Sequence, residues 1–144
     1  MIKYFEPGRM DEIMHIWLYT NIRAHDFIDA NYWNSLFDEV RAALPSSSLF
    51  VFEENGVIKG FIGITGGQYI AGLFVLEEYQ SRGIGRKLLD HCKQHYPRLE
   101  LDVFAKNEKA VEFYKRNGFA VSGISMNPDF HQEEYRMLWT RKFR

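Results

Sequence analysis

The chain has 144 residues, of which 46% are hydrophobic and 26% charged, and its formal net charge is −1. These values are typical of a globular protein, and we expect residues 1–144 to form a single domain with a sizeable core. The basic residues are scattered, so we expect no nucleic-acid partner. The N-terminal segment is too polar for a signal peptide and no apolar run approaches membrane-spanning length, which favours a cytoplasmic protein without a membrane partner.

The first third of the chain predicts a short strand and two helices. Residues 2–5 favour a strand, because Pro7 and Gly8 follow as a turn signal. Apolar residues recur at helical spacing over residues 10–20, and a second helical stretch covers residues 30–44. We therefore expect two amphipathic helices in succession, each with one face against a core.

The middle of the chain predicts three strands. Residues 49–53, 57–65 and 68–75 are rich in β-forming side chains and are separated by glycine-containing turns. Gly72 lies inside the third strand. A glycine in a strand interior often marks a β-bulge or a place where a ligand approaches the backbone, and a glycine that is merely tolerated is the alternative.

The last third of the chain predicts alternating helices and strands. The expected elements are a helix over residues 83–95, a strand over 99–104, a helix that Asn107 caps and Gly118 ends, and a hairpin of strands 119–126 and 134–140. A strand, a helix and a strand in series imply a right-handed crossover, so strands 68–75 and 99–104 should pair in parallel. Together these elements predict an α/β fold.

Cys92 is the only cysteine, so the chain cannot form an internal disulfide. It falls on the apolar stripe of the helix over residues 83–95, which favours a small buried side chain over a nucleophile. No cluster of cysteines and histidines has the spacing of a zinc site, and we expect no bound metal.

The turn before that helix has the features of an anion site. Gly83 and Gly85 stand at the helix start, where backbone N–H groups are unpaired and the helix dipole favours a phosphate. Arg82, Arg86 and Lys87 add positive charge beside them. A glycine-containing surface loop with ordinary cations is the alternative.

Two common phosphate motifs do not fit this turn. Leu88 and Leu89 stand where a P-loop needs its second glycine and its lysine. The dinucleotide fingerprint needs a third glycine at Leu88, although Glu100 and Asp102 lie at about the distance of its ribose-binding acid, roughly 20 residues on. A dinucleotide-binding oxidoreductase is therefore the weaker interpretation.

The run Gln80-Ser81-Arg82-Gly83-Ile84-Gly85 resembles the Q/R-x-x-G-x-G/A signature of the GNAT superfamily of N-acetyltransferases. The resemblance covers residues 57–119, and downstream it includes Asn107, Ala110, Tyr114 and the pair Gly118-Phe119. It implies a mixed central sheet of about seven strands flanked by about four helices. In that fold a splayed parallel pair of strands lies in the middle of the sheet, with a bulge near Gly72.

The resemblance implies acetyl-CoA as the co-substrate. The signature cradles the pyrophosphate in that family, and the backbone of the strand before it pairs with the pantetheine arm. The coenzyme-binding residues that this implies are Leu73, Phe74, Val75, Gln80, Ser81, Arg82, Gly83, Ile84, Gly85, Arg86, Asn107 and Tyr114.

The resemblance also implies catalytic roles. Family members commonly place a tyrosine at the position of Tyr114, where a phenol with a pKa of about 10 can protonate the departing thiolate. Some members that acetylate protein amines carry a glutamate at the position of Asp102, which suggests Asp102 as the base. The aspartate is one methylene shorter, so a water molecule would relay the proton. A strand carboxylate that faces solvent or an arginine is the alternative.

The acceptor site is expected between the first two helices, because this segment borders the acceptor in GNAT proteins. A subset of bacterial members has a similar His-Asp-Phe loop and Tyr-Trp pair here. The acceptor-binding residues that this implies are His25, Asp26, Phe27 and Tyr32, and His25 with Asp26 is a second candidate for the base.

We therefore expect an acetyl-CoA-dependent N-acetyltransferase that transfers the acetyl group directly in a ternary complex. The acceptor would be a primary amine of a protein, a peptide or a small molecule, and the enzyme a monomer or homodimer. The alternative is a catalytically weak CoA-binding regulatory domain.

Overall fold

The computed structural model describes residues 1–142 and contains a seven-stranded sheet with helices on both faces. The strands are β1 (Ile2–Tyr4), β2 (Ser48–Glu54), β3 (Val57–Thr65), β4 (Tyr69–Val75), β5 (Arg98–Phe104), β6 (Ala120–Asn127) and β7 (Gln132–Thr140). The α-helices are α1 (Met10–Ala24), α2 (Ala30–Ala43), α3 (Ile84–His95) and α4 (Glu108–Arg116). Short 3-10 helices are η1 (Pro7–Arg9), η2 (Leu44–Ser46) and η3 (Glu77–Tyr79). None of the helices in the described residues is long and apolar enough to cross a membrane.

The predicted elements are confirmed to within two residues at their ends, except at the end of α1. Helix α1 continues to Ala24, four residues past the predicted end, because the buried Asn21 donates its amide to the Trp17 carbonyl and Ile22 packs on the core. Helix α4 has nine residues and ends at Arg116. Gly118 follows it with φ +92°, a left-handed conformation that favours glycine after a helix.

The strand order is β1-β2-β3-β4-β5-β7-β6. Strands β4 and β5 pair in parallel, as the crossover through α3 predicted, and the other neighbours pair antiparallel. This mixed sheet with a central parallel pair confirms the fold that the motif resemblance implied.

Strand β4 carries a bulge beside Gly72. Its pairing with β3 shifts between Gly63↔Gly72 and Ile64↔Ile70, so Ala71 is the extra residue. A bulge bends its strand and interrupts the ladder. On the other side, β4 pairs with β5 only at Tyr69↔Glu100, and the two strands separate beyond that point. The predicted bulge and the predicted splayed pair are both present.

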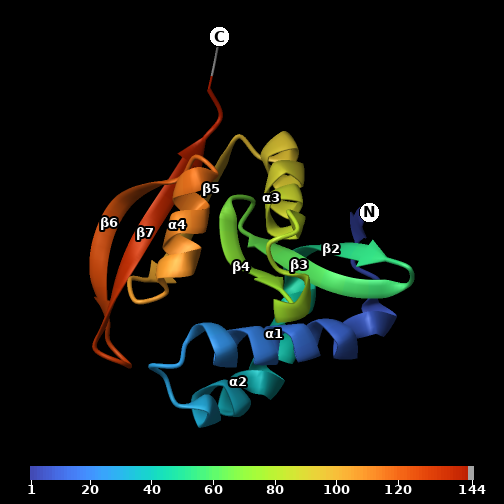
Figure 1. Cartoon of the computed structure of the whole chain (residues 1–144), viewed down its shortest axis with the longest axis horizontal. Coiled ribbons are helices and arrows are strands. Elements are labelled where there is room, and N and C mark those ends of the chain that lie inside the picture. The colour runs from blue at the N-terminus through green and yellow to red at the C-terminus, as the bar shows by residue number, and fades with distance from the viewer. Residues whose placement is uncertain (143–144) are drawn as a thin grey trace.

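Two cores cover the two faces of the sheet. One lies under α3 and α4 and includes Ile62, Leu88, Leu99 and Met137, each fully buried. The other lies under α1 and α2. Figure 1 shows α1 and α2 along the lower side of the molecule and α3 and α4 above them. The opening between β4 and β5 therefore lies between two packed layers.

Candidate active site

A cavity of about 280 Å³ lies where β4 and β5 separate. Its walls come from β4, β5, the C-terminal half of α1 with the residue after it, the first turn of α2, α4 with its N-cap residue, and one residue of β7. A wider groove of about 420 Å³ lies between β1, β2 and α3. We assign the site to the first cavity, because several of the candidate residues line it and none of them lines the second.

The turn between β4 and α3 is tight and is held by hydrogen bonds. Ser81 and Gly83 both have positive φ, +65° and +82°, and the Gly83 carbonyl accepts the N–H of Lys87 at 3.0 Å. The Gln80 side chain donates to the Val75 carbonyl at 2.9 Å and ties the turn to the end of β4. The unpaired N–H groups of the first turn of α3 therefore come directly after a tight turn whose position is fixed by these bonds.

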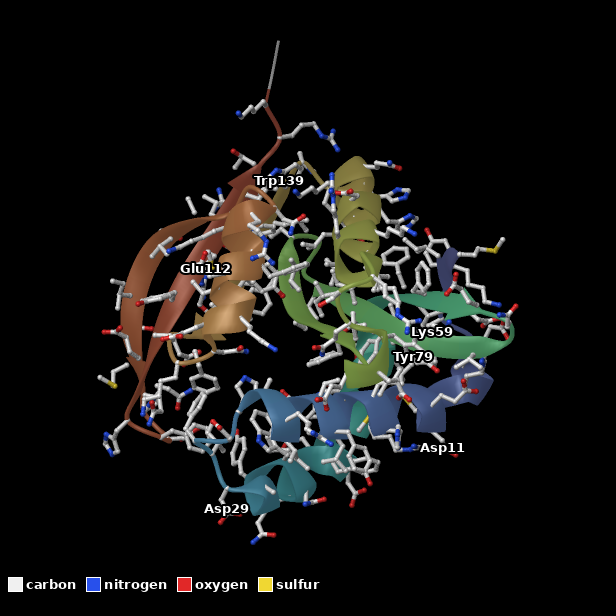
Figure 2. All side chains as sticks on the ribbon, in the orientation of Figure 1. Asp11, Asp29, Lys59, Tyr79, Glu112 and Trp139 are labelled. Carbon is white, nitrogen blue, oxygen red and sulfur yellow. The ribbon has the colours of Figure 1, made fainter. Side chains whose placement is uncertain are left out.

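Cations gather beside this turn. The Lys59 ammonium lies 4.7 Å from the centroid of the Tyr79 ring, and the Arg82 guanidinium lies 5.8 Å from the same centroid. Figure 2 shows Lys59 and Tyr79 next to each other where β3 passes η3. Arg86 lies on the first turn of α3, 3.7 Å from Asp90. Lys59 comes from the preceding hairpin, and the local motif gave no signal for it.

Gly85 brings α3 close to α4. A Cβ atom at this position would lie 3.1 Å from the Phe113 ring, closer than ordinary van der Waals contact. Gly83 differs, since a Cβ there would meet nothing within 4 Å. The two motif glycines therefore have different structural roles. One supplies a left-handed backbone at an open turn, and the other allows two helices to approach.

On the side that faces β5, the β4 backbone has no strand partner beyond the bulge. Leu73 and Phe74 line the cavity, and β5 pairs with β4 only at Tyr69. The Phe74 ring lies directly over Gly72, because a Cβ atom at Gly72 would come within 2.3 Å of it. An unpaired strand edge can accept an extended ligand that carries amides, as an added strand does.

Tyr114 lies on α4 with its ring buried at 8% exposure. It lines the cavity, and no residue within 1–142 forms a hydrogen bond to its hydroxyl. Burial raises the pKa of Tyr114 above its usual value, and the charge of a nearby ionised Tyr69 would raise this pKa further. The phenol therefore stays protonated at neutral pH with its hydroxyl free for a ligand.

Asp102 lines the cavity from β5 and is already hydrogen-bonded. The Tyr69 hydroxyl donates to its Oδ2 at 2.9 Å, and Arg136 donates to both of its oxygens at 2.7 and 3.0 Å. Burial, and then the bond to Asp102, raise the pKa of Tyr69 to about 12. The carboxylate therefore stands in an ordered group with a neutral phenol and a guanidinium.

His25 connects the end of α1 to the start of α4. Its Nδ1 lies 3.0 Å from the Asn21 carbonyl, which only accepts, so Nδ1 carries the proton in the neutral ring. Its Nε2 then accepts from the Asn107 amide at 3.4 Å. The Asn107 side-chain oxygen caps α4 by accepting the N–H of Ala110. Burial lowers the pKa of His25 below its usual value, which favours this neutral form.

The other predicted acceptor residues lie around His25. Phe27 packs edge-on against His25 at 5.7 Å between centroids, and Tyr32 packs edge-on against Phe130 at 4.5 Å. Asp26 is exposed and is not part of the cavity wall. Of the four predicted acceptor residues, only His25 lines the cavity, whereas Phe27 and Tyr32 pack in the aromatic layer outside its wall.

The predicted site residues did not include several residues of the cavity wall, among them Trp33 of the Tyr-Trp pair. Trp33 stacks on His25 at 5.1 Å, and Glu134 enters from β7. The pairing of β7 with β5 places Glu134 here, and that register has no local sequence signal. Within residues 1–142, no group of three or more His, Cys, Asp or Glu side chains is arranged to hold a metal ion.

Comparison with known proteins identifies the family of this chain. The model of the acetyltransferase (GNAT) domain matches residues 24–132, more than half of the chain. The chain belongs to the GNAT acetyltransferase family. The turn and helix that carried the motif resemblance lie inside the matched region.

Two GNAT proteins of Escherichia coli (strain K12) are close in sequence. The peptidyl-lysine N-acetyltransferase YiaC is 33% identical over 140 residues, 96% of each chain. The peptidyl-lysine N-acetyltransferase YjaB is 37% identical over 80% of this chain and 78% of its own. The solution structure of apo YjaB matches with a TM-score of 0.84 and 30% identity over 99% of this chain and 98% of its own.

A more distant GNAT structure shares the fold. The PaiA N-acetyltransferase of Thermoplasma acidophilum, in complex with coenzyme A, matches with a TM-score of 0.82 and 17% identity over 97% of this chain and 98% of its own. At this identity the likeness shows that the two chains share a fold.

Replacing Gly83 by valine tests the donor turn. The backbone at Gly83 has φ +82°, which a β-branched residue resists, and the new side chain would project into the open turn. We expect calorimetric titration to show no measurable CoA binding. Gly56→Val is the matched control, because Gly56 has φ +78° and an equally open surrounding in the β2–β3 hairpin. If Gly83→Val binds CoA as well as Gly56→Val does, the pyrophosphate lies elsewhere.

Proposed function

We propose that this protein transfers the acetyl group of acetyl-CoA directly to a primary amine, and that the acceptor is the side chain of a protein lysine. The observation that carries the proposal is the cavity between β4 and β5, which has an unpaired strand edge on one side and a free tyrosine hydroxyl on another. Membership of the GNAT family and two relatives named as peptidyl-lysine N-acetyltransferases support the reaction and the acceptor class.

The donor would bind along β4 and the turn that follows. Its pyrophosphate would lie at Gln80–Arg86, where N–H groups and nearby cations favour an anion. Its pantetheine amides would pair with the free edge at Leu73–Val75. The ladder turns the Phe74 backbone groups toward Phe61 of β3. The Val75 carbonyl already accepts one bond from Gln80, so the groups that remain on this edge are those of Leu73 and the Val75 N–H. Asn107 would contact the pantetheine from the start of α4.

Direct transfer needs no nucleophile from the protein. Burial raises the pKa of the Cys92 thiol to about 12, and Cys92 lies in the core under α3 outside the cavity wall. A thiol that stays protonated is a poor nucleophile. The amine would therefore attack the thioester carbonyl itself, and holding both reactants in one cavity supplies much of the acceleration.

Tyr114 is the proposed general acid. As the tetrahedral intermediate collapses, the carbon–sulfur bond breaks and the thiolate leaves with an electron pair that accepts a proton. The Tyr114 ring is buried, and its hydroxyl is protonated and has no hydrogen-bond partner within residues 1–142, which suits this donation. The residue lies on the helix that Gly85 and Phe113 hold against α3, so its position depends on the donor turn.

Asp102 is the proposed base, acting through water. An alkylammonium with a pKa of about 10.4 must lose a proton before it can attack. The Asp102 Oδ2 atom already accepts from both Tyr69 and Arg136, whereas Oδ1 accepts only from the Arg136 Nε and keeps a lone pair that can accept from a water molecule. His25 is less suited to this role, because its Nε2 already accepts from Asn107. We propose that His25, Phe27 and Tyr32 shape the acceptor rim, with Asp26 at its outer edge.

The function is tested by mixing the protein with acetyl-CoA and a blocked peptide that contains one lysine. We expect free CoA thiol to appear in step with the acetylated peptide, and no reaction when the lysine is already acetylated. With acetyl-CoA alone, direct transfer predicts no release of thiol and no change in the mass of the protein. CoA binding by calorimetry without any turnover would instead identify a CoA-binding regulatory domain.

Tyr114→Phe tests the acid. The change removes one hydroxyl and keeps the buried ring, so the KM for acetyl-CoA should change little while kcat falls by roughly 10²–10⁴-fold. Tyr96→Phe is the matched control, because Tyr96 is a partly buried tyrosine that packs on the same core outside the cavity. A near-normal kcat in Tyr114→Phe, measured where chemistry limits the rate, removes this residue from the mechanism.

Asp102→Asn tests the base through the pH profile. If Asp102 helps to deprotonate the amine, kcat/KM should fall most near neutral pH and recover at high pH, where more of the acceptor is already neutral. Glu100→Gln is the control, because Glu100 also pairs with Arg136 from β5, at 3.6 Å, but lies outside the cavity wall. An equal loss for Asp102→Asn at every pH would indicate that Asp102 only positions Tyr69 and Arg136.

A further inference from the structure

Glu134 is a cavity carboxylate with no role in the proposed chemistry. It lies on β7 directly opposite Phe104 of β5, and residues opposite each other in a ladder point to the same face. Phe104 packs against His25 and Phe27, so this face is the acceptor side of the sheet. Glu134 therefore enters the cavity from the side where the amine must arrive.

The charge of Glu134 is not neutralised by any cation within residues 1–142. Its one hydrogen-bond partner there is the neutral amide of Asn127, which donates to Oε1 at 2.7 Å. The two other carboxylates on this face of the C-terminal strands, Asp102 and Glu100, both pair with Arg136. A half-buried carboxylate beside a cavity, held by one neutral donor, keeps the capacity to bind a cation.

The surroundings of Glu134 suit an alkyl chain that ends in a charge. Phe104, which lies opposite Glu134 and lines the cavity with it, belongs to an aromatic group with Phe130 and Tyr32. The ring centroids are 6.1 Å apart for Phe104 and Phe130 and 4.5 Å apart for Phe130 and Tyr32. The methylene groups of a lysine side chain pack well on such rings, and the faces of aromatic rings also attract an ammonium group.

We propose that Glu134 binds the ammonium group of the acceptor lysine and makes the cavity select a positively charged side chain. This inference rests on the proposed function and adds the element that recognises the acceptor. The ammonium forms a charge-assisted hydrogen bond to Glu134, and the aromatic group formed by Phe104, Phe130 and Tyr32 packs on the methylene stem. Asn127 orients the carboxylate from the end of β6.

The test uses two blocked peptides of identical sequence, one with a central lysine and one with norleucine, which has a similar stem and no ammonium. Each is titrated calorimetrically into the wild-type protein saturated with CoA, a complex that binds the acceptor without reaction. We expect the lysine peptide to bind about ten- to a hundred-fold more tightly, the range for a hydrogen bond to a charged group. Glu134→Gln should remove most of this difference.

Steady-state kinetics give the second readout. Glu134→Gln should raise the KM for the lysine peptide about ten- to a hundred-fold, with kcat at saturation and the KM for acetyl-CoA little changed. Glu133→Gln is the matched control, because it removes the same charge from the neighbouring residue, which is exposed and points to the other face of β7. Glu134→Asp keeps the negative charge on a shorter side chain. Its KM for the lysine peptide should lie between those of the wild type and Glu134→Gln.

The outcomes separate the two proposals. A wild-type protein that acetylates no lysine peptide contradicts the proposed function. An active wild type whose Glu134→Gln variant matches Glu133→Gln in KM and in lysine preference overturns the role of Glu134. A decrease in kcat for Glu134→Gln with an unchanged KM also overturns this role, because it would indicate that Glu134 takes part in proton transfer. Thermal melting of each variant tests whether it is folded. If Glu134→Gln is unfolded, the KM of Glu134→Asp for the lysine peptide tests the proposal instead.

Discussion

The site depends on one interruption of regular structure, the separation of β4 from β5 after the pair Tyr69↔Glu100. The extra residue Ala71 bends β4 away from its neighbour, and the unpaired backbone beyond it becomes available to a ligand. A continuous sheet would have satisfied these groups internally and would have left no space between the two packed layers. The cavity and the unpaired strand edge are both consequences of this separation.

The point where the strands still meet is reinforced by polar side chains. Gln68 donates to Glu100, Tyr69 donates to Asp102, and Arg136 of β7 bonds Asp102 and lies near Glu100. These contacts join β4, β5 and β7 next to the opening, so the strands separate from a fixed position. Asp102 belongs to this junction as well as to the cavity wall, and one substitution there affects both.

Local signals in the sequence predicted much of the fold and the tight turn before α3. Turn glycines, helical periodicity and the crossover rule identified the strands, the helices and the parallel pair, and the φ of +82° at Gly83 is what the motif requires. Contacts between distant segments had no such signal. The bond from His25 to Asn107 depends on how α1 meets α4, and the position of Glu134 depends on the register between β5 and β7.

The close approach of Gly85 to Phe113 limits which residues the motif can carry at this position. A methyl group 3.1 Å from the ring needs a shift of only a few tenths of an ångström, whereas any longer side chain would push α4 away from α3. Alanine is therefore the largest residue that packing should tolerate, which agrees with the alternation of glycine and alanine at the last position of the family signature. The restriction comes from two helices in contact, and it would hold even if no coenzyme ever bound.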